Sequence, residues 1–477
     1  MKGFLDSVFH FRQNGTTARI EVIAGITDFM TLAYIIMLNP NILANNQPDR
    51  GFWNGIFMAT CIGSALAMFC MAILANKPFV LAPGMGVNSF FAMIVSNIAA
   101  ALGIGYVQGY RAAMCIILVE GILFIVLSLL NVRQKIVEAI PLSIRIGIAP
   151  AIGLMLINIG FGSNAAVYTE KGSYYVLRDF FGAMMPSLLR NDMGGEAFSR
   201  MILTTVTVLT GLVLIILFSR RGWKSAVLLG MLAASGLFWA GQAIFLHEDP
   251  FSGLRDASFL PPFRDMAENT LFRLDFSGLL KLGGVTVTTL IITFCMIDMF
   301  DTVGVFMGTA SRAGMMDEKG NMPKMKEALL SDAIGTVAGA CLGTSTVTTY
   351  AESVAGVEAG GRTGMTALVT GILFLLCTFL SPIAAIIPSA ATSCALIYVG
   401  ILMLMGLKNV KFDKVEDFAP TSVMLLTMPV TGSIGHAIGL GIILYTAIRV
   451  FSGRFKEVSL LTYVVTVLFL LKFFMVY

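Results

Sequence analysis

Two acidic side chains lie close together inside an apolar stretch: Asp298 and Asp301 are three residues apart within Thr293 to Thr302. On a helix this spacing places both carboxylates on one face. A charged side chain at the centre of a membrane costs roughly 3 kcal/mol or more, so acids in a spanning helix usually mark an ion or substrate pathway. We interpret both as candidate proton carriers, and Asp298 also as a candidate substrate ligand. The alternative is a structural acid or a helix end at the membrane interface.

A third acid, Glu352, follows the hydroxyl-rich, β-branched run from Thr344 to Thr349. Such a run favours a short extended strand, after which Glu352 falls in the first turns of a half-helix. Free N–H groups at a helix start suit a polar or anionic ligand, and a carboxylate can accept hydrogen bonds from ring N–H groups. We predict that Glu352 and Thr349 contact substrate and that Glu352 shares in proton coupling. The alternative is a capping acid.

A second interrupted segment runs from Ala82 to Asn88 and contains Pro83, Gly84 and Gly86. Proline and clustered glycine interrupt a continuous helix. The Asn88 amide both donates and accepts hydrogen bonds, as a nitrogen heterocycle requires of its site. We predict that Asn88 and Gly86 line a substrate site. A cap for the following half-helix is the alternative for Asn88, and both roles can coexist.

Three further polar residues are candidates for a role in chemistry. Asp28, within Gly25 to Thr31, is a fourth candidate intramembrane acid and a candidate for proton coupling. His436 follows a glycine-rich turn, and we interpret it as a packed histidine rather than a proton relay. Arg362 is interpreted as a positive residue of an inside loop.

The chain contains no nucleophile elbow, P-loop or zinc motif. Its seven cysteines form no CxxC pair and are interpreted as small packing residues. We therefore expect neither an enzyme nor a cofactor nor a metal site. ATP-driven transport is disfavoured, which leaves a secondary carrier or a channel.

The amino-acid composition indicates whether the chain folds in water or in a lipid bilayer. Hydrophobic residues make up 57% of the chain and charged residues 13%, whereas soluble domains carry about 25% charge. The net charge of +4 comes without a basic run, so we expect no nucleic-acid partner. The composition predicts an all-α polytopic protein of the lipid bilayer.

A spanning helix needs about 20 mainly apolar residues. Such stretches occur seven times on each side of the polar segment 247–282. We place them near residues 20–38, 54–75, 86–102, 111–130, 139–158, 199–218, 224–246, 283–309, 326–342, 349–358, 364–387, 391–406, 416–450 and 457–476. Pro429 and Gly432 divide 416–450 into two short pieces, which predicts either a hairpin that does not cross fully or two crossings. With two crossings the total is odd and the C-terminus lies outside.

Lysine and arginine gather in alternate short loops, as in Arg220, Arg221 and Lys224, which predicts a cytoplasmic N-terminus. Some twenty mixed residues precede the first span, so we expect no signal peptide. The stripe from Phe4 to Phe9 predicts a short amphipathic helix on the membrane surface.

The two interrupted segments fall in the third span of each half. Corresponding breaks in two halves are typical of an inverted-repeat transporter with its site near the midplane. Exposed backbone at that depth is tolerated only where it lines a cavity or is buried in protein. We therefore expect short strands at the broken third and tenth spans, with the substrate site between them.

Five ordered motifs resemble the azaguanine-like branch of the nucleobase–cation symporter-2 family of purine permeases. They are Gly15 to Thr27, Ala82 to Asn88, Phe300 to Gly304, Gly343 to Tyr350 with Glu352 and Ser353, and Gly360 to Ala367. The resemblance runs nearly end to end and implies 14 spans in two inverted seven-helix repeats, usually assembled as a homodimer. It implies that family positions for binding or coupling fall on Asn88, Asp298, Asp301 and Glu352. Where Asp28 stands, the family usually has threonine.

The implied domain organisation combines the two halves of the chain. It comprises a cytoplasmic segment (1–19), a substrate-holding core (20–130 and 283–387), a moving gate (131–246 and 388–477) and an outer loop (247–282). We predict import of hypoxanthine or guanine, with adenine next, by proton symport with alternating access in the inner (plasma) membrane. The alternatives are an anion exchanger of similar fold, which acids at both half-helices disfavour, and a purine channel.

Overall fold

The computed structural model describes residues 2–45, 47–130, 142–164, 168–171, 174–177, 195–255, 258–312, 315, 322–350, 352–410, 413–431 and 434–475. Its first half comprises α1 Lys2–Phe9, α2 Ala18–Leu32, α3 Ile35–Ala44, α4 Arg50–Cys70 with η1 Met71–Ala75, β1 Leu81–Pro83, α5 Met85–Leu102, α6 Tyr106–Leu129, α8 Leu142–Ile159 with η2 Gly160–Asn164, β2 Tyr168–Lys171, β3 Tyr174–Leu177, α10 Gly195–Arg220, and α11 Ala226–Gly241 with η3 Gln242–Leu246.

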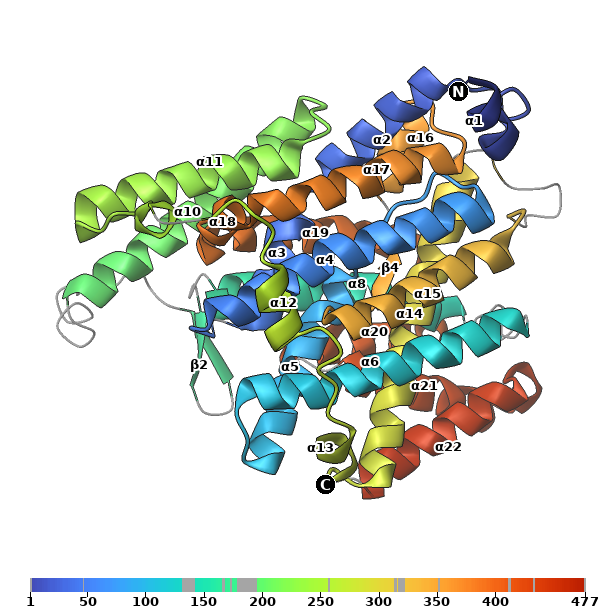
Figure 1. Ribbon diagram of the computed structural model, residues 1–477. Helices are drawn as coiled ribbons and strands as arrows, with labels where there is room; N and C mark the ends of the chain where they lie inside the picture. The colour runs from blue at the N-terminus through green and yellow to red at the C-terminus, as the bar shows by residue number, and fades with distance from the viewer. Residues whose placement is uncertain are drawn as a thin grey trace.

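The second half comprises η4 Ser252–Leu254, α12 Phe263–Asn269, α13 Phe276–Leu280, α14 Gly284–Arg312, α15 Met325–Leu342, β4 Val347–Thr349, α16 Ser353–Glu358, α17 Gly364–Leu376 with η5 Cys377–Leu380, α18 Ser381–Ala385, α19 Ser389–Leu404 with η6 Met405–Asn409, α20 Val415–Thr431, α21 Ile434–Phe451, η7 Phe455–Glu457 and α22 Leu460–Met475. Figure 1 shows the course of the chain through these elements.

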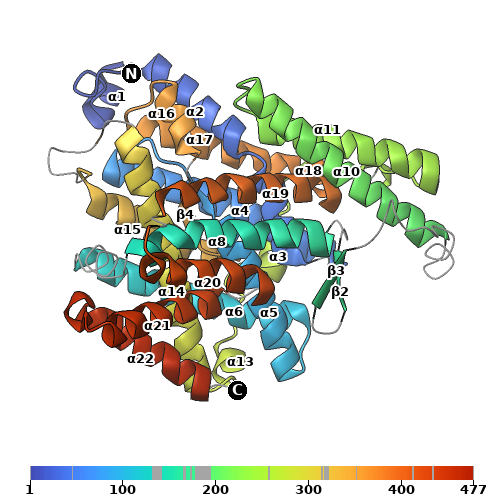
Figure 2. The same ribbon diagram turned by 180° about the vertical axis from the view of Figure 1, so that it is seen from behind.

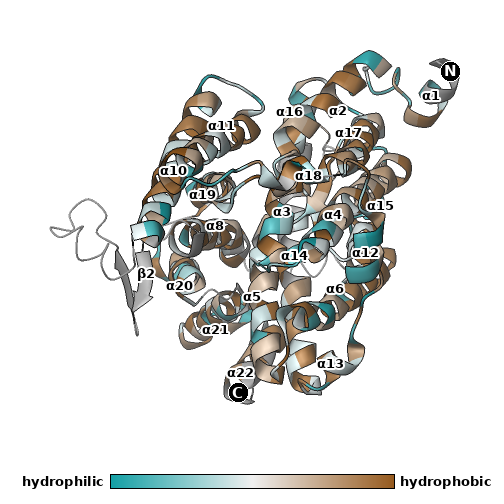
Figure 3. Cartoon of the chain, turned by 60° about the vertical axis from the view of Figure 1, so that its left-hand side comes forward, coloured by the Kyte–Doolittle hydropathy of each residue, from teal (hydrophilic) through white to brown (hydrophobic). Residues whose placement is uncertain are grey.

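The polytopic helical fold that the sequence predicts is confirmed. Seven helices among the described residues are long and apolar enough to cross a membrane, and four shorter apolar helices accompany them. Brown, apolar residues cover most of the helices in Figure 3, whereas α12, in the polar segment 247–282, is largely teal. Outward-facing side chains such as Val213, Leu217 and Val467 are about half exposed, as lipid contact requires.

Residues 416–450 form two helices, α20 and α21, that pack against each other. Arg449, near the end of α21, pairs with Asp417 at the start of α20, and Arg454 pairs with Glu416 beside it. The two ends of the segment therefore lie together, and the segment is a helical hairpin. The predicted division of 416–450 into two pieces is confirmed, and α22 follows as a further helix packed on α21.

Helix packing divides the bundle into two sets. In the first helix group, α2 to α6 pack with α14 to α17; in the second, α8, α10 and α11 pack with α19, α20 and α21. Figure 2 shows α8 lying between α19 and α20 at the centre of the second group. Contacts between the groups are fewer and include α3 with α19 and α2 with α11.

The broken third and tenth spans meet at the centre of the first helix group, as expected. β1 and β4 pair antiparallel, with Leu81 opposite Thr349 and Pro83 opposite Val347. The two paired strands are here called the β1–β4 ribbon. Because the strands run in opposite directions, α5 and α16 leave the ribbon from opposite ends, which is the arrangement an inverted repeat requires. Beyond these two strands, β2 and β3 form an antiparallel hairpin between α8 and α10, which was not predicted.

A glycine turn sets the entry into the second strand. Gly343 ends α15 with φ +100°, a conformation that side-chain-bearing residues rarely adopt. A Cβ there would also lie 2.3 Å from the Cβ of Thr270. The chain can therefore turn out of α15 and become extended immediately.

The N-terminal segment packs against protein rather than lying wholly on a membrane surface. Phe9 and Phe11 are buried together with Ala72, and Asn76 Nδ2 donates a 3.0 Å hydrogen bond to the carbonyl oxygen of Phe9. Val8 remains exposed. The predicted amphipathic helix is thus anchored at its C-terminal end to the end of α4.

Candidate functional site

The start of the extended segment is fixed by two asparagines. Asn39 of α3 donates to the hydroxyls of Thr344 and Thr60 at 3.0 and 2.7 Å. Asn88 Nδ2 donates to Asn39 Oδ1 at 2.5 Å, and Asn88 Oδ1 accepts from the Ser345 hydroxyl. The fully buried Asn88 amide therefore joins α5, α3 and the strand entry, whereas Gly84 holds the N-cap position of α5 without a side-chain cap.

The following hydroxyls bond to other helices. Thr346 donates to Glu120 Oε2 of α6 at 3.0 Å, and the Thr348 and Thr302 hydroxyls lie 2.7 Å apart. Thr349 is only 2% exposed, yet its hydroxyl has no hydrogen-bond partner among the described residues. An unsatisfied buried hydroxyl costs free energy unless a ligand or water supplies a partner. The Thr349 hydroxyl is therefore available to form a hydrogen bond with a ligand.

Glu352 occupies the N-cap position of α16, directly after the ribbon. Its Oε1 accepts a 3.0 Å hydrogen bond from the Tyr34 hydroxyl, which comes from the break between α2 and α3. Tyr34 is fully buried. Sequence reasoning missed it, although a tyrosine within the predicted span 20–38 was the available signal.

Asp298 belongs to a buried pair of acids that share one hydroxyl. Thr302 Oγ1 lies 3.3 Å from Asp298 Oδ1 and 3.3 Å from both carboxylate oxygens of Asp332 in α15. A hydroxyl has one hydrogen and can donate to only one of them at a time. Asp332 was missed, although it is an acid within the predicted span 326–342. Asp301 lies in α14, but its side chain is outside the described residues.

Asp28 is buried between α2 and α16. Its Oδ1 accepts a 2.6 Å hydrogen bond from the Gly356 N–H, while Oδ2 has no partner among the described residues. A Cβ on Gly356 would lie 2.2 Å from Asp28 Oδ2. The carboxylate therefore packs directly on the backbone of the half-helix that Glu352 begins.

A further acid, Glu21, bonds to the loop between α16 and α17 and to the first turn of α17, and it was also missed. It accepts from the Arg362 N–H at 2.8 Å and from the Thr366 hydroxyl at 2.6 Å. The Arg362 guanidinium in turn donates to the carbonyl oxygen of Val357 at 2.7 Å. A cation at the carboxyl end of a helix is favourable, so Arg362 stabilises α16.

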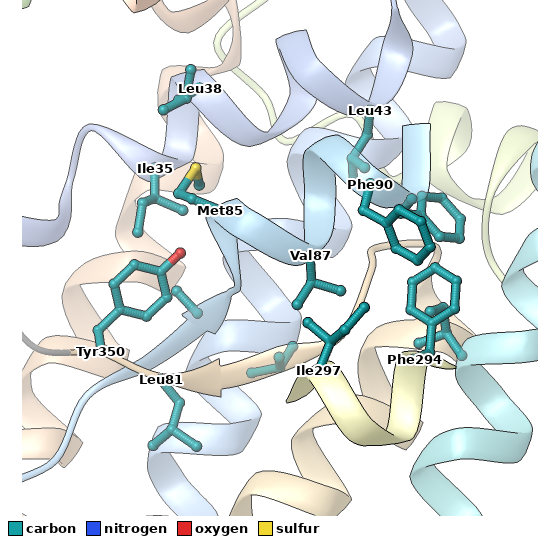
Figure 4. Packing of buried hydrophobic residues seen from close by; sticks show 14 of the residues in the cluster. Ile35, Leu38, Leu43, Leu81, Met85, Val87, Phe90, Phe294, Ile297 and Tyr350 are labelled. Carbon is teal, nitrogen blue, oxygen red and sulfur yellow. The ribbon is translucent and has the colours of Figure 1, made fainter. Parts of the chain in front are cut away.

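Apolar side chains surround these polar groups. Phe90 of α5 and Phe294 of α14 have ring centroids 5.0 Å apart. Figure 4 shows this pair beside the ribbon, with Val87 facing Ile297 and with Tyr350 near Met85. Planar hydrophobic walls with a few oriented polar groups are typical of small-molecule sites.

The remaining predicted residues contribute less. Gly86 lies in the first turn of α5, after Gly84 at the N-cap. His436 is exposed, and its ring stacks on Phe473 of α22 with centroids 5.5 Å apart, so it packs on a neighbouring helix. Within the part of the chain that the structure describes, no three His, Cys, Asp or Glu side chains form a group able to hold a metal.

A comparison with known structures gives the fold a precedent. The chain is similar to the transmembrane domain of a cyanobacterium bicarbonate transporter, BicA, with a TM-score of 0.60 at 15% identity, over 89% of this chain and 97% of that one. At such low identity the likeness concerns the fold alone.

Sequence comparisons identify the family. A family model described as a permease family, Xan_ur_permease, matches residues 19–428. The adenine permease AdeQ of Escherichia coli is 36% identical over 99% of this chain and 97% of its own length. The guanine/hypoxanthine permease PbuO of Bacillus subtilis is 33% identical over 98% of this chain and 100% of its own length. The chain therefore belongs to the nucleobase–cation symporter-2 family and is a multi-pass membrane transporter.

Proposed function

We propose that the protein imports purine nucleobases, hypoxanthine and guanine ahead of adenine, by proton symport. The observation that carries the proposal is the pairing of Glu352 with Tyr34 next to the unused hydroxyl of Thr349, at the crossing of the two broken spans. Full-length similarity to adenine and to guanine/hypoxanthine permeases supports a purine as substrate.

Recognition would rest on complementary donors and acceptors. Hypoxanthine and guanine carry a ring N1–H beside a carbonyl oxygen, so the Glu352 carboxylate could accept from N1–H while a hydroxyl donates to the carbonyl. Adenine lacks the N1–H and offers an exocyclic amine beside a ring acceptor. An ionised Glu352 can only accept, which favours the oxopurines.

Proton coupling would use the buried acids. Asp298 and Asp332 share the Thr302 hydroxyl, and Thr302 contacts Thr348 of the ribbon. A proton gained by either acid would change which acceptor the Thr302 hydroxyl can use, and with it the hydrogen bonds that reach β4. Asp301 and Asp28 remain candidates for the same coupling.

Alternating access would follow from the two helix groups. In this proposal the first helix group is the core (20–130 and 283–387), which carries the substrate, and the second is the gate (131–246 and 388–477), against which the core moves. We further propose a cytoplasmic N-terminus, on the distribution of lysine and arginine, in the cell membrane. The proposed homodimer rests on the family resemblance.

An anion exchanger is the competing function, since BicA of similar fold is a bicarbonate transporter. Asp28 and Glu352 both lie against the first residues of α16. Among the ion pairs formed by the described residues, none includes either acid. Two acids that form no direct ion pair oppose the binding of an anion beside them.

Transport in liposomes tests the proposal. Purified protein should accumulate radiolabelled hypoxanthine when the outside is made acidic, and a protonophore should abolish accumulation. Unlabelled guanine should compete better than adenine, and bicarbonate should not compete. Uptake that follows sodium and ignores the proton gradient would contradict proton coupling, and competition by bicarbonate alone would favour the anion exchanger.

A further inference from the structure

A single peptide group of α16 is held from both sides. The Gly356 N–H donates to Asp28 Oδ1 at 2.6 Å, and Lys224 Nζ donates to the carbonyl oxygen of Ala355 at 3.3 Å. That carbonyl and that N–H belong to the same peptide group. Lys224 lies in the turn between α10 and α11, whereas Asp28 lies in α2. The bridge therefore joins the second helix group to the first.

We propose that Lys224, the Ala355–Gly356 peptide and Asp28 form a latch between gate and core, here called the 355–356 latch. The ammonium group faces the negative end of the peptide dipole and the carboxylate faces its positive end. Charge-assisted hydrogen bonds are stronger than neutral ones, and bonds in a chain polarise one another. Lys224 and Asp28 thus interact through the peptide without touching, and they position the half-helix that Glu352 begins.

The two ends of the 355–356 latch differ in burial, which suits a contact that must open in every transport cycle. Asp28 is fully buried and stays with the core. Because Gly356 has no side chain, the Asp28 carboxylate can reach the backbone of α16. Lys224 is exposed. Exposed charged contacts contribute little to stability, so the Lys224 end can break without a large barrier while the Asp28 end remains in place.

The latch acts only while α16 and the turn between α10 and α11 lie together. Its loss should shift the protein toward the conformation in which they are apart. A shift of that kind strengthens binding from one side of the membrane and weakens it from the other, because each side is open in only one conformation. This consequence rests on the proposed alternating-access transport.

The test compares Lys224→Gln, Asp28→Asn and the double variant in oriented proteoliposomes. The half-saturation concentration for hypoxanthine is measured on each side. We expect each single substitution to change the ratio of the two values in the same direction by about two- to five-fold, as loss of an exposed charged contact allows. The double variant should change it no further than the larger single effect. Arg221→Gln, on the same exposed turn, should leave the ratio unaltered.

An unchanged ratio in Lys224→Gln, or effects that add in the double variant, would overturn the latch. Hydrogen–deuterium exchange of residues 353–358 in nanodiscs provides a readout that needs no substrate. Both single variants should raise exchange there, and unchanged exchange would reject the latch even if hypoxanthine transport is confirmed. Raised exchange in a protein that transports no purine would support the latch and reject the proposed function.

Discussion

The Tyr34 hydroxyl donates a 3.0 Å hydrogen bond to Glu352 Oε1, joining two residues 318 positions apart in the chain. Tyr34 lies where α2 gives way to α3, and Glu352 lies where β4 gives way to α16. Two interruptions of helical structure thus face each other. Each leaves polar groups that a continuous helix would have satisfied internally.

Tyr34→Phe should weaken hypoxanthine binding about tenfold, which corresponds to about 1.4 kcal/mol. The substitution keeps the ring but removes the donor that orients the Glu352 carboxylate. Equilibrium binding to detergent-purified protein measures the effect. Tyr463→Phe is the matched control, because that hydroxyl bonds the Phe455 carbonyl at an exposed position. Equal affinity in the two variants would mean that Tyr34 does not orient Glu352 for binding.

Thr349→Val and Thr346→Val should have different effects on purine binding and on thermal stability. The Thr349 hydroxyl has no partner among the described residues, so its removal should weaken purine binding and leave thermal stability unchanged. Thr346→Val breaks the bond to Glu120 and should lower stability by about 1 kcal/mol or more, since a buried acceptor loses its donor. Thermal unfolding and purine binding on both variants decide the matter. Unchanged binding in Thr349→Val would remove Thr349 from the site.

Glu352→Gln and Asp298→Asn should separate binding from coupling. Glutamine replaces one acceptor with a donor, so Glu352→Gln should mainly weaken purine binding. Asp298→Asn should retain binding and exchange but lose accumulation against a gradient, because an amide cannot carry the proton. Equilibrium binding set beside gradient-driven uptake measures both effects. If Asp298→Asn fails to bind while Glu352→Gln binds without accumulating, the two roles are reversed.

Gly356→Ala should destabilise the protein by about 1–3 kcal/mol, the usual cost of overpacking a buried contact. The new methyl group would lie 2.2 Å from Asp28 Oδ2 and would displace the carboxylate. Thermal unfolding in detergent measures the loss. Combining Gly356→Ala with Asp28→Ala should recover part of it, because the clashing group is then absent. A double variant less stable than Gly356→Ala would show that another neighbour causes the strain.

The sequence alone determined the features that depend on local composition. Long apolar stretches predicted the spanning helices, and the Pro-Gly and β-branched runs predicted breaks before α5 and α16. The spanning helices and the breaks can be predicted locally, because each depends on the conformational preferences and hydrophobicity of neighbouring residues in the chain. Glu352, Asn88 and Asp298 stood out because a polar group at that depth is costly wherever it lies.

The tertiary structure decided which of these groups meet. Tyr34, Glu120 and Asp332 were missed because each is one polar residue in an apolar span, and its importance appears only when a distant segment supplies its partner. Ion pairs between the two ends of the α20–α21 hairpin, such as Arg449 with Asp417, likewise became visible only in the folded chain. Local patterns report what a segment prefers, whereas hydrogen bonds between segments far apart in the chain depend on how the helices pack.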